Sequence, residues 1–201
     1  MFCQRLITKL TLTLLIGTTL IIGDKIEENL LFPFHRAFCD NFIHAIVALF
    51  SWTLIIVLSN ASIINNINDI FLCTLLSSLI DLDHFIAAKS LTLNNAIRLD
   101  KRPFLHSTTI PILIWALLLF ISHILKSTQI NNYAWIILTS FLTHHIRDGA
   151  RRGLWFAPIG STKPIPYHVY ILTSIFLPYI IYYLLSVSKN YITINQLRLP
   201  I

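Results

Sequence analysis

Long stretches of the chain contain no Asp, Glu, Lys or Arg, and their lengths are the first structural signal in the sequence. Four such stretches cover residues 41–68, 103–125, 127–146 and 164–188. A helix needs about 20 apolar residues to cross the hydrocarbon core of a bilayer. Each stretch meets that length, so the pattern predicts several transmembrane helices.

Two weaker apolar stretches extend this pattern. Residues 6–23 are apolar, and no pair of small residues spaced as a signal-peptide cleavage site precedes Asp24, which favours a retained span. Residues 69–88 are interrupted by Asp81, which a helix starting at Asp69 places about 18 Å along its axis, within hydrocarbon depth. The predicted spans are therefore 6–23, 41–59, 69–88, 104–125, 134–148 and 167–187.

The composition agrees with a membrane bundle. Only 12% of the 201 residues are charged, whereas soluble domains usually carry about 25%. Cys3, Cys39 and Cys73 are too scattered for a disulfide framework or a thiolate metal site. We therefore predict one all-α integral-membrane domain over residues 1–201, a polytopic bundle of five or six transmembrane helices.

Basic residues gather on one side of the predicted bundle. If the spans alternate in direction, most Lys and Arg residues fall in or beside the loops 24–40, 89–103 and 149–166. The positive-inside rule assigns that side to the cytoplasm and places both termini on the other side. It does not say to which organelle the membrane belongs. The net charge of +6 is thus spread over short loops that set topology, which argues against a nucleic-acid partner.

Acidic residues and histidines lie at the cytoplasmic ends of the second to fifth predicted spans. Alternation of the spans brings these ends to one depth of the bilayer, although they are far apart in the sequence. Ionisable groups at membrane depth are costly to bury and indicate a functional site by default. The group comprises Asp40, His44, Asp81, Asp83, His84, His106, His144, His145 and Asp148.

Helical spacing pairs imidazoles with carboxylates in this group. His144 and Asp148 are four residues apart and share a helix face, as do Asp81 and His84 at a spacing of three. Such pairs bind divalent ions in helical bundles. Asp83 joins them only if the third helix ends beside it. Asp and His without thiolate suit zinc, manganese, iron or magnesium and do not choose among these metals.

Simpler roles compete for several of these residues. Asp148 could pair with Arg152 one turn further along a helix, and Asp40 suits the N-cap of the second span. His145 faces about 100° away from His144 around a helix, which favours a hydrogen bond or a headgroup contact. These alternatives do not exclude a metal site built from the other members.

Four segments of the chain carry a distinctive set of residues. They are DNFIHAIVALFSW at 40–52, SLIDLDHFIAAKSLTL at 78–93, RPFLHSTTIP at 102–111 and LTHHIRDGARRGLWFAPIG at 142–160. Together they closely resemble the transmembrane protein 267 family, a multi-pass membrane family of animals. The resemblance runs over most of the chain, and it implies a topology class without implying an activity.

A more distant resemblance, over about half the chain, is to a bacterial inner-membrane family of metal-dependent hydrolases that includes LexA-regulated members. Its Asp-x-Asp-His motif matches residues 81–84, its Thr-His-Ser segment aligns with residues 105–107, and its His-x-x-x-Asp motif matches residues 144–148. Two positions depart from the family pattern, because Lys101 stands where a histidine is expected and Leu105 replaces the threonine.

This second resemblance implies a divalent-metal site. Asp83 would serve as a ligand or as the general base, and Arg102 would attract an anionic headgroup together with Arg151 and Arg152. The helix-end position of His44 adds it as a further candidate. The metal-ligand candidates are Asp81, Asp83, His84, His106, His144, Asp148 and His44.

Three functions are compatible with such a site. The first is a metal-dependent hydrolase acting on a lipid-like or phosphoester substrate from the cytoplasmic face, with membrane lipids as its surroundings. The second is a non-enzymatic membrane protein in which the Asp/His cluster is structural, a reading that Lys101 favours. The third is an ion transporter, which ranks last because the polar residues gather at one face.

Overall fold

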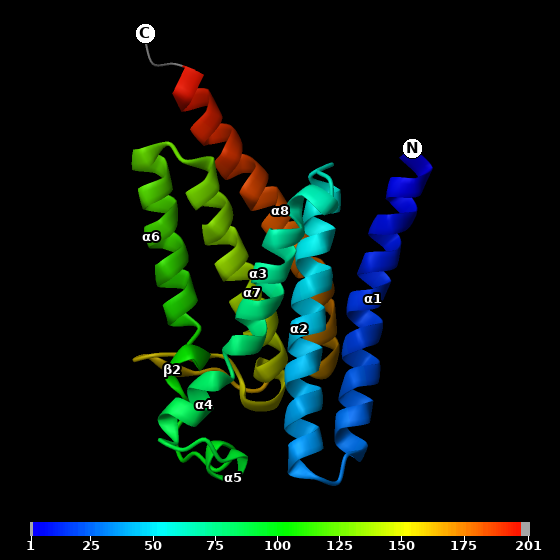
Figure 1. Ribbon diagram of the computed structural model, residues 1–201, viewed down its shortest axis with the longest axis vertical. Coiled ribbons are helices and arrows are strands. Elements are labelled where there is room, and N and C mark those ends of the chain that lie inside the picture. The colour runs from blue at the N-terminus through cyan, green and yellow to red at the C-terminus, as the bar shows by residue number, and fades with distance from the viewer. Residues whose placement is uncertain (1, 198–201) are drawn as a thin grey trace.

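The computed structural model describes the backbone of residues 2–197, with side chains over residues 3–189, as a bundle of long helices (Figure 1). The long helices are α1 (Phe2–Asn29), α2 (Pro33–Leu58), α3 (Ile67–Leu79), α6 (Thr109–Leu125), α7 (Thr128–Arg152) and α8 (Tyr167–Leu197). The short elements are η1 (Ile64–Asn66), α4 (Leu82–Ala87), α5 (Leu93–Ala96), η2 (Phe104–His106), β1 (Trp155–Phe156) and β2 (Gly160–Ser161).

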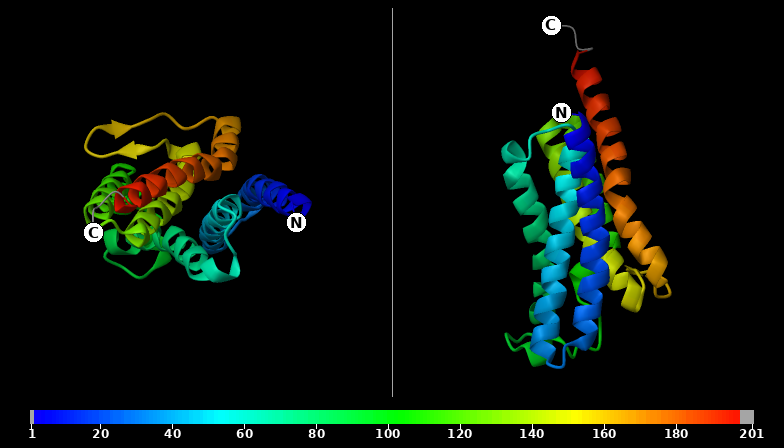
Figure 2. Two further views of the ribbon diagram at one scale, coloured as in Figure 1. Left: turned by 90° about the horizontal axis from the view of Figure 1, so that it is seen from above. Right: turned by 90° about the vertical axis from the view of Figure 1, so that its right-hand side faces the viewer.

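Successive long helices alternate in direction, so α8 ends on the side of the bundle on which α1 begins. Figure 1 shows the start of α1 and the end of α8 at the upper end, with α4, α5 and the β1–β2 hairpin at the lower end. Seen from above in Figure 2, the hairpin extends sideways from the helices. The lower end therefore corresponds to the side that the basic loops assign to the cytoplasm.

Within the described residues, four helical stretches are long and apolar enough to cross a membrane. They are Cys3–Asn29, Pro33–Leu58, Ile64–Ala87 and Tyr167–Lys189, and the apolar helix Thr109–Leu125 is shorter. The predicted all-α multi-pass bundle is confirmed. The number of spans depends on how the shorter α6 and the more polar α7 are counted.

The polar helix α7 is enclosed by other helices. It packs against α2, α3, α6 and α8, and its buried residues include Thr139, Thr143, His144, His145 and Arg147. Small and hydroxylated side chains suit helix contacts inside a membrane, where they hydrogen-bond within the bundle. The arrangement therefore keeps the imidazoles of α7 away from lipid.

The second span begins earlier than the sequence predicts. Proline is favoured at the first position of a helix because it has no N–H to leave unpaired, and α2 begins at Pro33. Asp40 consequently lies two turns inside α2 instead of at its start. The N-cap interpretation of Asp40 is wrong, and its carboxylate is available for contacts between helices.

The third predicted span is interrupted. The helix α3 ends at Leu79, the backbone turns at Ile80 and Asp81, and the short helix α4 follows from Leu82. A continuous helix through residues 69–88 would have turned Asp83 away from Asp81. The turn removes that restriction, so both carboxylates can face the same end of the bundle.

The end of α7 depends on a glycine. Gly153 has a φ of 72°, a conformation that side-chain-bearing residues rarely adopt, and its backbone approaches Thr162 in the following loop. A Cβ atom at Gly153 would overlap the carbonyl oxygen of Thr162. The hairpin can fold back beside α7 because this position has no side chain.

We expect Gly153→Ala to lower the free energy of unfolding by about 2 kcal/mol or more, because it adds strain and a backbone clash. Gly160→Ala is the matched control, since its φ is 140° but nothing lies within 4 Å of an added Cβ atom. Thermal unfolding of both variants in detergent measures the difference. Equal stability of the two would contradict the close approach at Thr162.

Candidate metal centre

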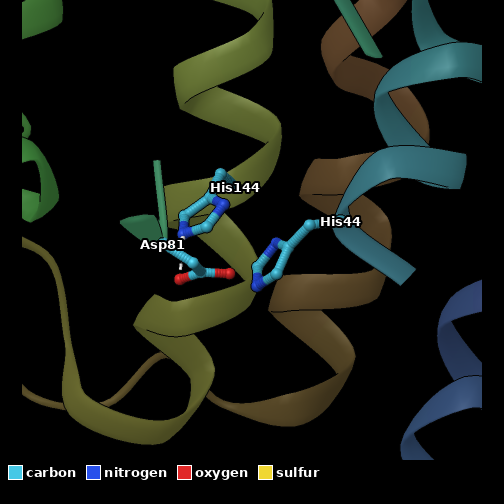
Figure 3. Close-up of side chains that lie close together, drawn as sticks. All are labelled: His44, Asp81 and His144. Carbon is cyan, nitrogen blue, oxygen red and sulfur yellow. Dashed lines mark ion pairs between the residues drawn. The ribbon is translucent and has the colours of Figure 1, made fainter. Parts of the chain in front are cut away.

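The structure brings the predicted metal-ligand residues together at the lower end of the bundle. They come from α2, from the turn and short helix after α3, from η2 and from α7. Figure 3 shows His44, Asp81 and His144 converging from three separate segments. Four overlapping groups have ligand atoms within 4.8 Å of one another: His44–Asp81–His144, Asp81–His84–His106, His106–His144–Asp148 and Asp40–His44–Asp148.

Four atoms form the inner part of this cluster. His106 Nε2 and His144 Nε2 are 3.4 Å apart. Asp81 Oδ1 lies 3.4 Å from the first nitrogen and 3.5 Å from the second, and Asp148 Oδ2 lies at the same two distances. Five of the six distances among these four atoms are therefore 3.4–3.5 Å.

This spacing is near that between ligands of one metal ion. Ligands of a four-coordinate zinc ion with bonds of about 2.1 Å are about 3.4 Å apart. Adjacent ligands of an octahedral ion with bonds of the same length are about 3.0 Å apart. The four side chains are therefore close enough to bind one ion together.

The imidazole of His144 is held in the tautomer that a metal requires. Its Nδ1 lies 3.0 Å from the carbonyl oxygen of Ser77. A carbonyl only accepts hydrogen bonds, so Nδ1 carries the proton and Nε2 of the neutral ring has a free lone pair. This nitrogen is the one that points at the centre.

Asp83 positions the second imidazole and lies outside the inner four atoms. Its Oδ1 is 3.2 Å from His106 Nδ1, and its Oδ2 accepts a 2.7 Å hydrogen bond from the backbone N–H of Leu105. Contact with Nδ1 directs the opposite ring nitrogen of His106 inward. Such outer carboxylates commonly orient metal-binding histidines.

The carboxylates attract positive charge to this position. Burial by itself lowers the pKa of His106, which lies in the loop before α6, but Asp148, Asp81 and Asp83 together raise that pKa to about 11. The three carboxylates therefore favour a positive charge at the His106 ring. Either a proton or a metal ion supplies the charge.

Asp81 is fixed by α2. Asn41 donates hydrogen bonds to Asp81 Oδ2 at 3.2 Å and to the carbonyl oxygen of Ser78 at 2.8 Å, and its own oxygen accepts from the Ser78 hydroxyl. One asparagine therefore braces the turn after α3 and leaves Asp81 Oδ1 facing the centre. Sequence alone did not predict this role of Asn41. The one feature that pointed to it was its position as a polar residue close to Asp40 and His44.

His84 and His145 occupy different surroundings. His84 lies near the opening of a cavity, with Nδ1 3.3 Å from Asp83 Oδ1 and 3.9 Å from Asp81 Oδ1. His145 is buried, and its Nε2 donates to the carbonyl oxygen of Leu105 at 2.9 Å while its Nδ1 contacts Thr108. His145 thus braces the segment that carries His106, in line with its expected hydrogen-bonding role.

Asp148 pairs with Arg151, and the predicted ion pair with Arg152 is wrong. Arg151 Nη2 donates to Asp148 Oδ1 at 2.6 Å, from three residues along α7 instead of four. Both spacings place side chains on the same helix face, so sequence alone did not separate them. Asp148 therefore offers one oxygen to Arg151 and the other to the two imidazoles.

The guanidinium of Arg102 is engaged by the backbone. It donates to the carbonyl oxygens of Gly153, at 2.9 Å, and of Arg152. Arg102 thereby ties the loop before η2 to the end of α7. Its side chain also lines the cavity, but its position points to a positioning role more than to substrate contact.

The cavity connects the inner cluster to the surface. Its volume is about 130 Å³, room for a few water molecules or one phosphate-sized group. Three inner residues, Asp81, His106 and Asp148, line it beside His84 and Arg151. A small anion entering from the lower end of the bundle could therefore reach the centre.

Fold and site together define a multi-pass α-helical membrane protein with an Asp/His cluster at one end of its bundle. Transmembrane protein 267 of Mus musculus is 36% identical over 163 residues, which are 80% of this chain and 74% of the relative. The same protein of Danio rerio is 40% identical over 146 residues, 72% of this chain and 65% of the relative. The chain belongs to the transmembrane protein 267 family.

Other comparisons add no activity. Transmembrane protein 267 of Xenopus laevis is 33% identical over 167 residues, 81% of this chain and 76% of the relative. No protein-family model and no solved structure matches the chain. The likeness to bacterial hydrolases therefore rests on the short motifs alone, and the function must be argued from the site.

Proposed function

We propose that this protein binds a divalent metal ion at the cytoplasmic end of its bundle and hydrolyses a phosphoester or lipid-like substrate there. The observation that carries the proposal is the convergence of His106 Nε2, His144 Nε2, Asp81 Oδ1 and Asp148 Oδ2, the four atoms that would surround a tetrahedral ion and that we call the inner tetrahedron. Once the ion has displaced the proton of His106, two carboxylates and two neutral imidazoles carry a charge of −2. A divalent ion neutralises that charge.

Zinc fits this arrangement best among the metals that Asp and His ligands accept. Zinc has no geometric preference from its d-electrons and is usually four-coordinate with nitrogen and oxygen ligands at about 2.0–2.2 Å. Magnesium and manganese favour six oxygen-rich positions. The two imidazole nitrogens among the four ligand atoms therefore favour zinc over these two metals.

The cavity gives the proposed reaction a place. A zinc ion lowers the pKa of a bound water and stabilises negative charge on a phosphoryl oxygen. Asp83 lies beside Nδ1 of His84, so the second nitrogen of this imidazole is available to accept a proton. Arg151 is 42% exposed and lines the same cavity, where its charge favours an anionic group.

The surroundings of the cavity suit an amphiphilic substrate. Ile86 is 75% exposed and Phe104 is 69% exposed, and in the sequence they lie within two residues of the cavity-lining residues His84 and Pro103. Exposed apolar side chains at the end of a membrane bundle favour contact with lipid. A lipid headgroup could enter the cavity while its chains remain beside these residues.

A structural metal staple is the second candidate function. Catalytic zinc usually has three protein ligands and one open position, whereas four protein ligands are typical of structural zinc. Hydrolysis at this centre requires a fifth position on the side of the cavity. The staple would join η2, the turn after α3 and α7, three segments that are separate in the sequence.

We expect the purified wild-type protein to contain zinc and both His144→Ala and Asp148→Ala to lose it, because each removes one corner of the tetrahedron. His35→Ala is the control, since His35 is exposed in α2 beyond the cluster. Elemental mass spectrometry in detergent measures the content. Full zinc content in folded His144→Ala would contradict the proposed ligand set.

Turnover separates the hydrolase from the staple. Zinc-loaded protein should hydrolyse a phosphodiester or phospholipid in mixed micelles, and His84→Ala should lower kcat by about 100-fold or more with zinc retained, because it removes the proton acceptor. His35→Ala should keep the wild-type rate. No turnover on any phosphoester, together with lower thermal stability after chelation, would support the staple instead.

We expect Asp83→Ala to weaken zinc affinity by about 10–100-fold without abolishing binding, because the carboxylate orients His106 from outside the tetrahedron. Competition with a fluorescent chelator measures the affinity. Asp100→Ala, in the exposed loop before Lys101, should leave it unchanged. An unchanged affinity in Asp83→Ala would show that His106 needs no such partner.

A further inference from the structure

A second group of possible ligand atoms adjoins the inner tetrahedron. His44 Nε2 lies 3.6 Å from Asp40 Oδ1 and 3.6 Å from Asp148 Oδ1. The other oxygen of Asp148 belongs to the inner tetrahedron, so this carboxylate bridges the two groups. A bridging carboxylate between adjacent positions is the arrangement that two-metal sites use.

Guanidinium groups already occupy the second position. Arg147 Nη1 donates to Asp40 Oδ1 and lies 3.4 Å from His44 Nε2. Arg151 Nη2 lies 2.6 Å from Asp148 Oδ1 and 3.0 Å from each oxygen of Asp40. Each of the three ligand residues in this group therefore already contacts a positive charge.

The inner tetrahedron differs in this respect. The contacts described for Asp81 Oδ1 are with the imidazoles of His84, His106 and His144. Those of Asp148 Oδ2 are with His106 and His144. The two positions thus have similar ligand types but different neighbours. Arginine side chains already contact the ligand atoms of the second position, whereas the carboxylate oxygens of the inner tetrahedron contact imidazole rings.

Arg147 cannot readily leave its position. Its side chain is 3% exposed, and it is held by Asp24 at 3.0 Å and by Glu27 at 2.6 Å in addition to Asp40. An arginine stays charged at any physiological pH. Displacing it would break its ion pairs with three carboxylates and leave a buried guanidinium unpaired, which is strongly unfavourable.

We infer that the centre takes one divalent ion and that the guanidinium groups of Arg147 and Arg151 take the place of a second. The inference rests on the proposed function, because the inner tetrahedron must bind its ion. The second positive charge facing a substrate is then Arg151, which is partly exposed and lines the cavity. A substrate that bridges the ion and Arg151 must carry an anionic group such as a phosphate.

Zinc stoichiometry tests this inference on the full-length protein in detergent. Dialysis against increasing zinc, followed by elemental mass spectrometry, should give one ion per chain at saturation. Two ions per chain would overturn the inference and leave the proposed function standing. A protein that binds no zinc would overturn the proposed function itself, and the inference with it.

A variant tests the part played by the guanidinium. Arg151→Met removes a partly exposed side chain and frees Asp40 and Asp148 Oδ1, so zinc binding should rise above one ion per chain at high zinc. Arg98→Met, which removes an exposed arginine from the loop after α5, should remain at one. If Arg151→Met also saturates at one ion, Arg151 does not hold the second position.

Discussion

The cost of burying carboxylates inside a helical membrane bundle is the constraint on which this structure depends. Unpaired ionised groups are expensive at membrane depth, so each must meet a cation, a hydrogen-bond donor or a metal. Asp148 illustrates the solution, because one oxygen meets Arg151 and the other faces His106 and His144. The neighbouring helices likewise supply partners to Asp40 and Asp81.

This constraint explains the position of α7. That helix supplies His144, Arg147, Asp148 and Arg151, and it is the one enclosed by α2, α3, α6 and α8. Its arginines reach carboxylates on α1 and α2, and the imidazole of His144 faces the turn after α3. The imidazole of His145 contacts the segment that carries His106. The polar contacts thus connect helices that otherwise meet through apolar side chains.

The sequence predicted the meeting place of these groups better than their pairing. Helical spacing and the alternation of spans placed Asp81, His106 and His144 at one depth, because both depend only on local geometry. The pairing of Arg147 with Asp24 and Glu27 was not predictable in this way. It joins helices far apart in the sequence, and no local pattern marks a contact between them.

Helix boundaries were the second gap. A long stretch without charged residues predicts that a helix exists, but it does not predict the residues at which the helix begins, breaks or ends. The break at Ile80–Asp81 decides that Asp83 contacts His106 from outside the tetrahedron, and the start of α2 at Pro33 places Asp40 within the bundle. These two details separate the inner ligands from the groups that position them.

The proposed zinc site is tested most directly by X-ray absorption at the zinc edge of the purified protein. Four nitrogen or oxygen neighbours at about 2.0–2.1 Å, with the outer-shell scattering of two imidazoles, are the predicted result. A six-coordinate shell, or a zinc signal without imidazole scattering, would contradict the assignment of His106 and His144 as ligands.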